Sequence, residues 1–494
     1  MQPSEMRSSI QIIALSMLAW AAIVPTSLAQ TRRMGLKMDD AKYLRLPGKS
    51  SNIKLKGAMP ASYSIREFLP EIADQGQDGT CVGWAAAYYM RTVMEAGKQG
   101  MGGQQAKIAA TAFSPNWLYG QVKSGLDNGC AEGVFLEDAL EVMKTKGTAL
   151  LSCAPADCNA KFDQCDEQAA GFKIADYATL FNPKDKDATT EQRVNAIKSA
   201  LVEGKNAVLI GMMVPLSFIE EATENWQAAP GESVDNTAGG HAMAVVGYDD
   251  AINGGSFLIA NSWGKTWGSN GYTWAKYGDL VRFTRNAYQI FPEPVAKPQP
   301  QAVTLKGNVD FSIGSGAMAV HSTLYKGIQV TPDQPDSKTE MITYSMSQPY
   351  PSGTRFKMVI SNTKQSYVYI LGSDQENRVS ALFPYNSGEV VSSAMVPANS
   401  TVLMPSANTS FTLDAVKGED YFVVFISQNE LNLDELTNKV KNAQGTIVQK
   451  AYAALGEEFI SPKDIAYDSG KISYEVKGAP KGSVVPILVK IIHQ

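Results

Sequence analysis

The stretch Phe257-Leu-Ile-Ala-Asn-Ser-Trp-Gly-Lys-Thr-Trp-Gly-Ser-Asn-Gly-Tyr272 is the most informative part of this sequence. Its apolar start lies between Gly255 and Asn261, which is typical of a short buried strand. A second segment, Gly239-Gly-His-Ala-Met-Ala-Val-Val-Gly-Tyr248, has a similar apolar run directly after a histidine. Both segments therefore predict strands with polar residues at their ends.

Signals for helices precede these strands along the chain. Ser114-Pro115 combines an N-cap residue with proline at the first helical position, and Thr189-Thr-Glu-Gln192 is a capping box. A third helix is predicted from Glu137 to Lys146, where Gly147 ends it, and a further strand from Ala207 to Met213. Because helices come first and strands later, the order indicates an α+β fold rather than alternating βαβ units.

Length and charge limit the classes of protein to consider. The chain has 494 residues, which leaves room for about two to four cores. It carries 44 Lys and Arg against 49 Asp and Glu, a formal net charge of −5, with no basic run dense enough to neutralise a series of phosphates. We therefore expect no nucleic acid as a partner.

Residues 1–29 have the pattern of a secretory signal peptide. Arg7 precedes an apolar stretch from Ile10 to Val24, and small residues place a cleavage site after Ala29. The apolar stretch is shorter than the ~20 residues that a membrane-spanning helix needs, although an uncleaved anchor is the alternative interpretation. We expect a secreted or periplasmic protein with no stable membrane span once the signal peptide is removed.

The five cysteines lie in the first third of the chain, at Cys81, Cys130, Cys153, Cys158 and Cys165. Disulfides persist after export, and an odd number of cysteines leaves one thiol over. Cys81 is the natural candidate for that thiol, and the other four can pair in three ways. Zinc is an alternative for the last three, but wide spacings and the lack of a nearby histidine disfavour it. We expect no metal or cofactor.

Changes in composition divide the rest of the chain. Residues 30–56 are polar, show no evident core and are interpreted as a linker or a short pro-segment. Residues 57–292 hold the helices and strands described above. Residues 293–302 are rich in proline, which favours an extended connector. Residues 303–494 are rich in Ser, Thr, Val and Tyr, and we expect a mostly β region there.

This C-terminal region shows distinct strand and helix patterns. Runs at Phe356–Ile360 and Tyr421–Ile426 predict strands, and Ser483 to Ile492 predicts a final one. The span from Leu433 to Leu455 predicts one or two helices, interrupted near Gly445.

Cys81 stands at a predicted helix start. A loop with two glycines and polar turn-forming residues, Asp74 to Thr80, leads into the Ala-rich apolar segment Val82–Met90. A thiol there meets unpaired backbone N–H groups and the positive end of the helix dipole, which favour the thiolate. The thiolate is the nucleophilic form, so we interpret Cys81 as a candidate nucleophile. An inert core cysteine is the alternative.

The order of Gln75, Cys81, His241 and Asn261, and their local settings, resemble the papain-like cysteine peptidases. The two segments quoted first are similar to that family's histidine and asparagine segments. Alone, His241 could be a structural histidine and Asn261 a turn residue. The resemblance covers about residues 57–292 and implies a two-lobed domain, with a helical lobe and a β-barrel-like lobe that face each other across a cleft.

The resemblance also implies roles for these residues. Cys81 would attack the peptide carbonyl, and His241 would transfer the proton to the leaving amine. Asn261 would orient the imidazole ring, as the third member of a triad does. Gln75 and the Cys81 backbone N–H would donate hydrogen bonds to the oxyanion, and loss of one such donor typically lowers the rate ~10²–10³-fold.

Three further residues are expected near the substrate by resemblance. Trp263 would shield the Asn–His hydrogen bond from water and line the leaving-group side, while Gly133 and Gly240 would face the substrate backbone. The sequence departs from the family pattern around Cys81, where Thr80 and Val82 flank the thiol and the upstream cysteine is absent. The family's partner for Cys130 is therefore missing, so we expect its bridge to be rearranged.

Residues 339–430 resemble a bacterial β-domain of uncharacterised role that occurs attached to peptidases and kinases. We expect this module to bind envelope components, substrates or partner proteins. The whole chain is interpreted as an exported cysteine endopeptidase that acts on proteins or peptides. A catalytically inactive papain-like binding protein, and an acyl transferase or deamidase that uses the same Cys–His pair, are the alternatives.

Overall fold

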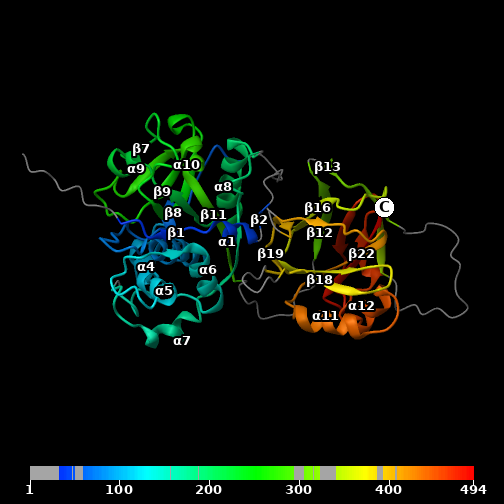
Figure 1. Cartoon of the computed structure of the whole chain (residues 1–494). Helices are drawn as coiled ribbons and strands as arrows, with labels where there is room; N and C mark the ends of the chain where they lie inside the picture. Colours follow the sequence, from blue (N-terminus) through cyan, green and yellow to red (C-terminus); the bar gives the residue numbers. More distant parts are fainter. Residues whose placement is uncertain are drawn as a thin grey trace, which may run out of the picture.

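The chain forms two bodies of secondary structure that lie side by side, one from residues 59–293 and one from residues 305–494 (Figure 1). The structure is a computed structural model, and the residues it describes are 33–46, 48–49, 59–155, 157–186, 188–293, 305–314, 316–322, 341–385, 393–405 and 409–494. The expected signal peptide and most of the expected proline-rich connector lie outside the described residues. Among the described helices, none combines the length and apolarity needed to cross a membrane.

One lobe of the first body is helical. A continuous helix runs from Cys81 to Lys98, through α2 (Cys81–Gly83), the π-helical η2 (Trp84–Arg91) and α3 (Thr92–Lys98). A Cβ on Gly83 would lie 2.2 Å from the Pro115 carbonyl oxygen, so the absence of a side chain lets the next helix pack directly against it. The other helices of this lobe are α4 (Gln105–Ala110), α5 (Pro115–Val122), α6 (Leu136–Thr145) and α7 (Asp166–Ala169).

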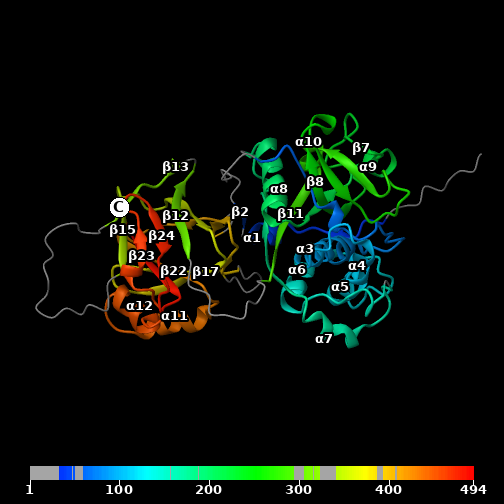
Figure 2. The same cartoon turned by 180° about the vertical axis from the view of Figure 1, so that it is seen from behind.

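The other lobe is built on a mainly antiparallel sheet. Its strands follow the order β5 (Ile174–Thr179), β11 (Thr284–Pro292), β6 (Val208–Met213), β8 (Gly240–Asp249), β9 (Ser256–Ala260), β10 (Tyr272–Lys276) and β7 (Asn225–Trp226). The short strand β3 (Ser62–Ser64) also pairs with β8. Helices α8 (Thr190–Gly204), α9 (Leu216–Glu220) and α10 (Tyr277–Phe283) belong to this lobe, which Figure 2 shows from behind.

The local sequence signals explain several of these elements. The Ser114 hydroxyl accepts a hydrogen bond from the Trp117 amide at the start of α5. Thr189 and Gln192 form the expected capping box at the start of α8. The predicted helices and strands of this body, and the α+β class, are therefore confirmed, with a helical lobe and a strand lobe.

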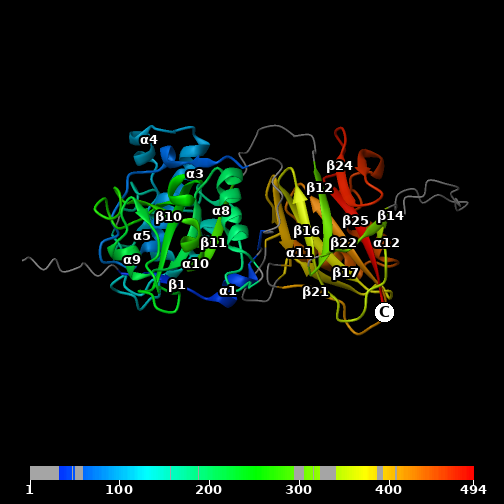
Figure 3. The same ribbon diagram turned by 90° about the horizontal axis from the view of Figure 1, so that it is seen from above.

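The second body is mostly β, as expected (Figure 3). One sheet contains β23 (Ile465–Tyr467), β24 (Ile472–Val476), β12 (Lys306–Ile313), β16 (Arg355–Asn362) and β20 (Ser400–Met404), with β13 (Gly316–Ala317) and β21 (Phe411–Thr412) at its sides. The other contains β14 (Val320–Ser322), β15 (Ile342–Met346), β25 (Val484–His493), β22 (Gly418–Ser427), β17 (Ser366–Ser373) and β18 (Val379–Phe383), and β19 (Met395–Val396) pairs with β17.

Two helices cover the outer face of the second sheet. The span predicted to hold one or two helices forms α11 (Leu433–Asn442) and α12 (Ile447–Leu455). Gly445 lies between them at φ +97°, a conformation that favours glycine, and Thr446 caps α12. Apolar side chains between the two sheets form one core, and those between the second sheet and these helices form another.

A short N-terminal segment, residues 33–49, differs from what its polar composition suggested. It contains β1 (Leu36–Lys37), α1 (Asp40–Arg45) and β2 (Gly48–Lys49). Tyr43 on α1 is only 1% exposed, and its hydroxyl donates to the Phe181 carbonyl at 2.8 Å. The expectation that residues 30–56 show no core is therefore wrong for this segment, because a few apolar side chains suffice to dock a helix onto a body that is already formed.

The cysteines pair in one of the three open ways. Cys130 is bonded to Cys158, and Cys153 to Cys165, while Cys81 is the free cysteine. The rearranged bridge of Cys130 thus reaches a cysteine within the same lobe. Two disulfides fit a compartment where thiols oxidise.

Candidate active site

Cys81 is the first residue of α2 and is fully buried. The loop before it is held from both sides. Asp74 accepts a hydrogen bond from the Gly76 amide at 2.9 Å, and the Gly79 amide donates to the Cys130 carbonyl at 2.6 Å. The predicted loop-to-helix junction is confirmed, and it points the thiol at the start of a helix where backbone N–H groups have no intrahelical partner.

His241 and Asn261 meet through the pairing of two neighbouring strands. His241 is the second residue of β8, and Asn261 directly follows β9, which pairs with β8. The His241 Nε2–H donates to Asn261 Oδ1 at 2.8 Å, and both residues are fully buried. The Ser262 amide also donates to this oxygen at 2.8 Å, which fixes the orientation of the Asn261 side chain.

Trp263 covers the imidazole. Its ring stacks on the His241 ring with centroids 4.5 Å apart and planes at 28°, and it is fully buried. Phe218 and Trp267 contact its edges in turn. The His241–Asn261 hydrogen bond therefore lies under a layer of aromatic rings that keeps water away from it.

The two lobes meet between Cys81 and β8. Helix α2, which begins at Cys81, packs against β8, and the backbone N–H groups of Gly35 and of Ala242, the residue after His241, lie close enough to the Cys81 sulfur to favour its thiolate. Gln75 lies beside them, with its amide nitrogen 2.8 Å from the Asp78 carbonyl oxygen and its amide oxygen 2.7 Å from the Ser262 hydroxyl. The fold thus gathers the four residues that the sequence singled out at one place.

The N-terminal segment lies between the two lobes at this place (Figure 1). Strand β1 pairs in parallel with β4 (Val134–Phe135), and the Val134 amide donates to the Gly35 carbonyl at 2.9 Å. A Cβ on Gly35 would lie 1.9 Å from the Gly79 carbonyl oxygen, and one on Gly133 would lie 2.2 Å from the Gly35 carbonyl oxygen. Only glycines allow this approach, so residue 35 fills the space beside Cys81.

The opposite wall shows the same close fit. A Cβ on Gly240 would lie 2.5 Å from the Leu36 carbonyl oxygen. Leu36 is 8% exposed, and its side chain points at Gly211. A Cβ on Gly211 would lie 2.7 Å from the Cδ2 atom of Leu36. Gly133 and Gly240, both predicted to face a substrate backbone, therefore face the backbone of this segment instead.

The segment also changes the chemistry of the site. The Gln75 Nε2–H donates to the Arg33 carbonyl oxygen at 3.3 Å, so a peptide carbonyl already lies at the predicted oxyanion donor. Burial raises the pKa of the Cys81 thiol to about 11, although the N–H groups of Ala242 and Gly35 oppose this shift. The helix start predicts a thiolate, whereas the covered site holds the protonated thiol at neutral pH.

Sequence reasoning missed two residues that hold one wall. The Tyr119 hydroxyl accepts a hydrogen bond from the Gly133 amide at 3.1 Å and donates to Asp127 at 2.6 Å. Asp127 in turn accepts from the Ala131 amide at 2.9 Å. A tyrosine in a helix and an aspartate in a loop carry no local signal of this role, because only their contact in space creates it.

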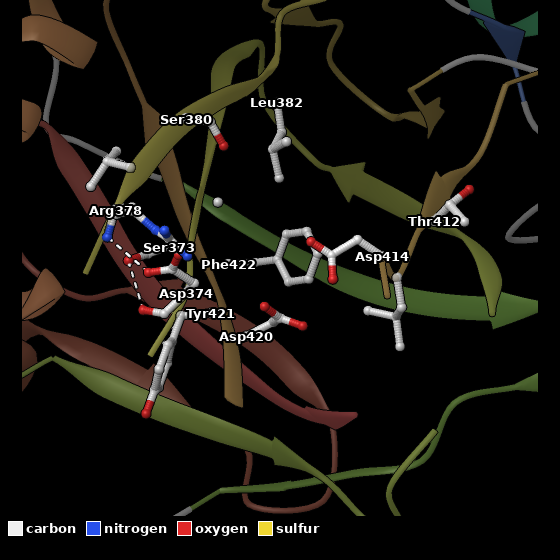
Figure 4. Close-up of a pocket in the computed structure, with 13 residues that line it drawn as sticks. Ser373, Asp374, Arg378, Ser380, Leu382, Thr412, Asp414, Asp420, Tyr421 and Phe422 are labelled. Atoms are coloured by element: carbon white, nitrogen blue, oxygen red, sulfur yellow. Dashed lines mark hydrogen bonds and ion pairs between the residues drawn. The ribbon is translucent and has the colours of Figure 1, made fainter. Parts of the chain in front are cut away.

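A separate polar pocket of about 270 Å³ lies in the C-terminal region (Figure 4). The Phe422 ring lies at its centre, with the side chains of Asp414 and Asp420 near it, and Arg378 is paired with Asp374 at 2.5 Å. It contains no cysteine or histidine. Within the described part of the chain, no group of His, Cys, Asp and Glu side chains is arranged to hold a metal ion.

Family models match both regions. Residues 59–291 match the model of the papain family cysteine proteases, and residues 349–430 match a domain of unknown function, DUF4384. A cathepsin L-like proteinase of Fasciola hepatica is 25% identical over 260 residues, which is 50% of this chain and 69% of the relative. An uncharacterized peptidase C1-like protein of Acanthamoeba polyphaga mimivirus is 35% identical over 107 residues, which span 22% of this chain and 33% of that protein.

Among solved structures, xylellain, a cysteine protease from Xylella fastidiosa, is 21% identical and covers 53% of this chain and 98% of its own, with a TM-score of 0.41. The family match covers both lobes, and its relatives support a cysteine peptidase. Residues 59–291, the two-lobed region of this chain, thus match the papain family of cysteine proteases, and a separate match to DUF4384 follows over residues 349–430.

Proposed function

We propose that this chain is an exported, thiol-dependent endopeptidase that hydrolyses peptide bonds through a Cys81 acyl-enzyme. The observation that carries the proposal is the buried His241–Asn261 hydrogen bond of 2.8 Å beside Cys81, the free cysteine. Helix α2, which begins at Cys81, packs against β8, which carries His241, and Cys81 and Ala242 share one buried cluster, so the two side chains belong to one site.

In the proposed first step, the Cys81 sulfur attacks the carbonyl carbon of the peptide bond. The thiol proton passes to His241, which gives it to the leaving amine as the C–N bond breaks. Asn261 keeps the imidazole in the tautomer and orientation that allow this transfer. Gln75 and the Cys81 backbone N–H donate to the oxyanion, and the donation from Gln75 to the Arg33 carbonyl supports this assignment.

In the second step, water hydrolyses the thioester. His241 takes a proton from the water as the oxygen attacks the acyl carbon. The C–S bond then breaks to release the acid, and His241 returns the proton to the sulfur, which restores the thiol. Trp263, stacked on the imidazole, would keep the ring in place during both transfers and line the leaving-group side.

The described conformation is a latent form in this proposal. Residues 33–37 fill the space that a substrate needs between Gly133 and Gly240, so they must leave before a peptide enters. Export is supported by the apolar stretch before Ala29 and by the two disulfides. The DUF4384 domain stays a candidate for binding envelope components or partner proteins.

Covalent labelling tests the proposal. An epoxide or chloromethyl ketone peptide should modify Cys81 alone, at a rate set by how often the N-terminal segment leaves the cleft. Gly35→Ala introduces a Cβ that has no room beside Gly79, so it should speed labelling and reveal peptide hydrolysis. A Gly35→Ala protein whose Cys81 reacts quickly but cleaves no peptide would indicate the inactive binding protein instead.

The products distinguish hydrolysis from acyl transfer. Hydrolysis yields free carboxyl termini even when an amine nucleophile is added, whereas a transferase yields the amide adduct and a deamidase leaves the peptide chain intact. Mass spectra of the products, with and without the added amine, separate these reactions. The same instrument locates the mature N-terminus and so tests cleavage after Ala29.

A further inference from the structure

The N-terminal segment that fills the cleft is also part of the C-terminal body. Strand β2 pairs in parallel with β5 of the peptidase region, where Gly48 lies opposite Thr179. On its other side β2 pairs antiparallel with β20, where Gly48 lies opposite Leu403 and Lys49 opposite Val402. These two residues thus join the sheets of both bodies into one (Figure 1).

In the described part of the chain, β2 is the strand that pairs with β20 on that side. The other side of β20 is paired with β16, so β2 is the partner that completes it. An edge strand presents unpaired N–H and C=O groups, which favour the addition of an extended segment. The structure shows what occupies this edge, namely residues 48–49 of the same chain.

Side chains from both bodies keep β20 next to β5. Ala178 on β5 and Phe291 on β11 pack against Met395 of the C-terminal body, and all three are buried. Two charge interactions also cross between the bodies. Lys144 of the peptidase region, which forms an ion pair with Asp176 at 3.1 Å, interacts with Glu430 of the C-terminal body. Lys357 of the C-terminal body interacts with Asp185 of the peptidase region. The slot that receives β2 is therefore formed by the contact of the two bodies.

We infer that the C-terminal body acts as a clamp on the peptidase, because the edge of β20 docks residues 48–49 and so holds residues 33–37 in the cleft. The docking of residues 48–49 does not depend on the proposed peptidase function. Regulation of activity by the clamp does rest on that proposed function. A ligand or protein that separates the two bodies would release β2 and ease the departure of Gly35 from Cys81.

The segment has a second anchor, which limits the expected effect. Tyr43 is buried against the peptidase region, and Asp40 forms ion pairs with Arg285 at 2.6 Å and Lys184 at 2.8 Å. If the cleft opens by release of the whole segment, loss of β2 pairing should raise the opening rate. If residues 33–38 detach alone while α1 stays docked, β2 should have no influence.

The experiment measures the rate at which iodoacetamide alkylates Cys81 in the full chain, under conditions that keep the disulfides intact. A Gly48→Pro, Lys49→Pro double variant removes both backbone N–H groups of β2. Lys49→Ala is the matched control, because it keeps the N–H and loses only the side chain. We expect the proline variant to react about 5- to 30-fold faster than the native chain, and the control to react at the native rate within twofold.

A disulfide lock tests the opposite direction. Gly48 and Leu403 lie opposite each other in the register, so Gly48→Cys with Leu403→Cys places two thiols at bridging distance. The oxidised double variant should protect Cys81 at least about 10-fold relative to either single variant. Peptide mass mapping separates Cys81 from the new cysteines.

Rates that stay within twofold of the native chain in both the proline variant and the locked variant would overturn the clamp. Peptide hydrolysis by the Gly35→Ala variant tests the peptidase assignment separately from the clamp. If the clamp variants shift Cys81 labelling as expected while Gly35→Ala hydrolyses no peptide, the clamp stands and the proposed catalytic function falls. If Gly35→Ala hydrolyses peptides and both clamp variants react like the native chain, the proposed catalytic function stands and the clamp falls.

Discussion

The peptidase region and the C-terminal region each hold a buried histidine with two polar neighbours. His241 bonds to Asn261 through Nε2, beside the Cys81 thiol. His493 bonds to Asp420 through Nδ1 at 2.7 Å and to the Ser352 hydroxyl through Nε2 at 3.1 Å. The second set has the order hydroxyl, imidazole and carboxyl that a serine hydrolase uses.

The backbone around each candidate nucleophile separates the two sites. The N–H groups of Ser352, Gly353 and Thr354 already donate to carbonyl oxygens of the protein, so none is left for an oxyanion. Cys81 instead begins a helix, and the nearby Gln75 side chain donates to the carbonyl of a peptide segment in the cleft. A nucleophile and a histidine are therefore not enough for acyl transfer. Hydrogen-bond donors that can stabilise the oxyanion must also lie beside them.

The largest expected difference comes from removing the side chains themselves. Cys81→Ala or His241→Ala, in a Gly35→Ala background, should lower kcat/KM for a peptide at least ~10⁴-fold, because nucleophile and proton carrier act as one unit. Ser352→Ala and His493→Asn should leave kcat/KM within twofold. Turnover of a fluorogenic peptide measures both sets. Substantial activity in Cys81→Ala would contradict the assignment of the site.

The oxyanion donor gives the next effect. Gln75→Ala in the same background should lower kcat ~10²–10³-fold while KM changes little, because the side chain stabilises charge that develops only in the transition state. Gln75→Glu keeps the size but removes the N–H donor, and should be equally slow. Steady-state kinetics with a peptide substrate check this, and a loss confined to KM would assign Gln75 to substrate binding.

The covering segment should shift the pH dependence of Cys81. Burial raises the pKa of the thiol to about 11, so at pH 8 only ~0.1% of the closed form is thiolate, and reactivity should rise up to that pKa. Gly35→Ala exposes the sulfur to solvent and so removes the burial that raises the pKa, which should make alkylation faster at neutral pH. Iodoacetamide rates from pH 6 to 11 test this, with Lys37→Ala as the control. Identical profiles in both variants would contradict it.

The smallest effect concerns stability in the C-terminal region. His493→Asn loses the hydrogen bonds that the buried imidazole makes to the half-buried Asp420 carboxylate and to the exposed Ser352 hydroxyl, which should lower the free energy of unfolding by ~1–3 kcal/mol. His321→Asn, at an exposed position, should be neutral. Urea unfolding measures both. An unchanged midpoint for His493→Asn would show that this network contributes nothing to stability.

Several elements were predictable because their signals are local. The cap at Ser114, the capping box at Thr189 and the break at Gly445 depend on residues three or four apart, and all three lie where the structure has helix ends. The candidate site was found for a different reason. His241 and Asn261 lie within long segments that resemble known ones, whereas Cys81 was singled out by its place at the start of an apolar helix.

The wall at Gly133 and the covered cleft were not predictable in the same way. Tyr119 and Asp127 support the wall only through contacts that the chain makes after folding. Leu36 and Tyr43 belong to a short stretch in which apolar residues are mixed with charged ones, and such a mixture looks alike in a linker and in a docked segment. Their burial depends on surfaces contributed by other parts of the chain.

The sequence alone predicted more than one domain, the α+β and mostly β characters, the free thiol and the residues proposed to act with it. These properties follow from local preferences and from which side chains the chemistry requires. The pairing of the disulfides, the strand that fills the cleft and the junction at Gly48 and Lys49 depended on the folded molecule. Each of these brings together groups from distant parts of the chain, and the free energy of such contacts depends on shapes that no short stretch of sequence encodes.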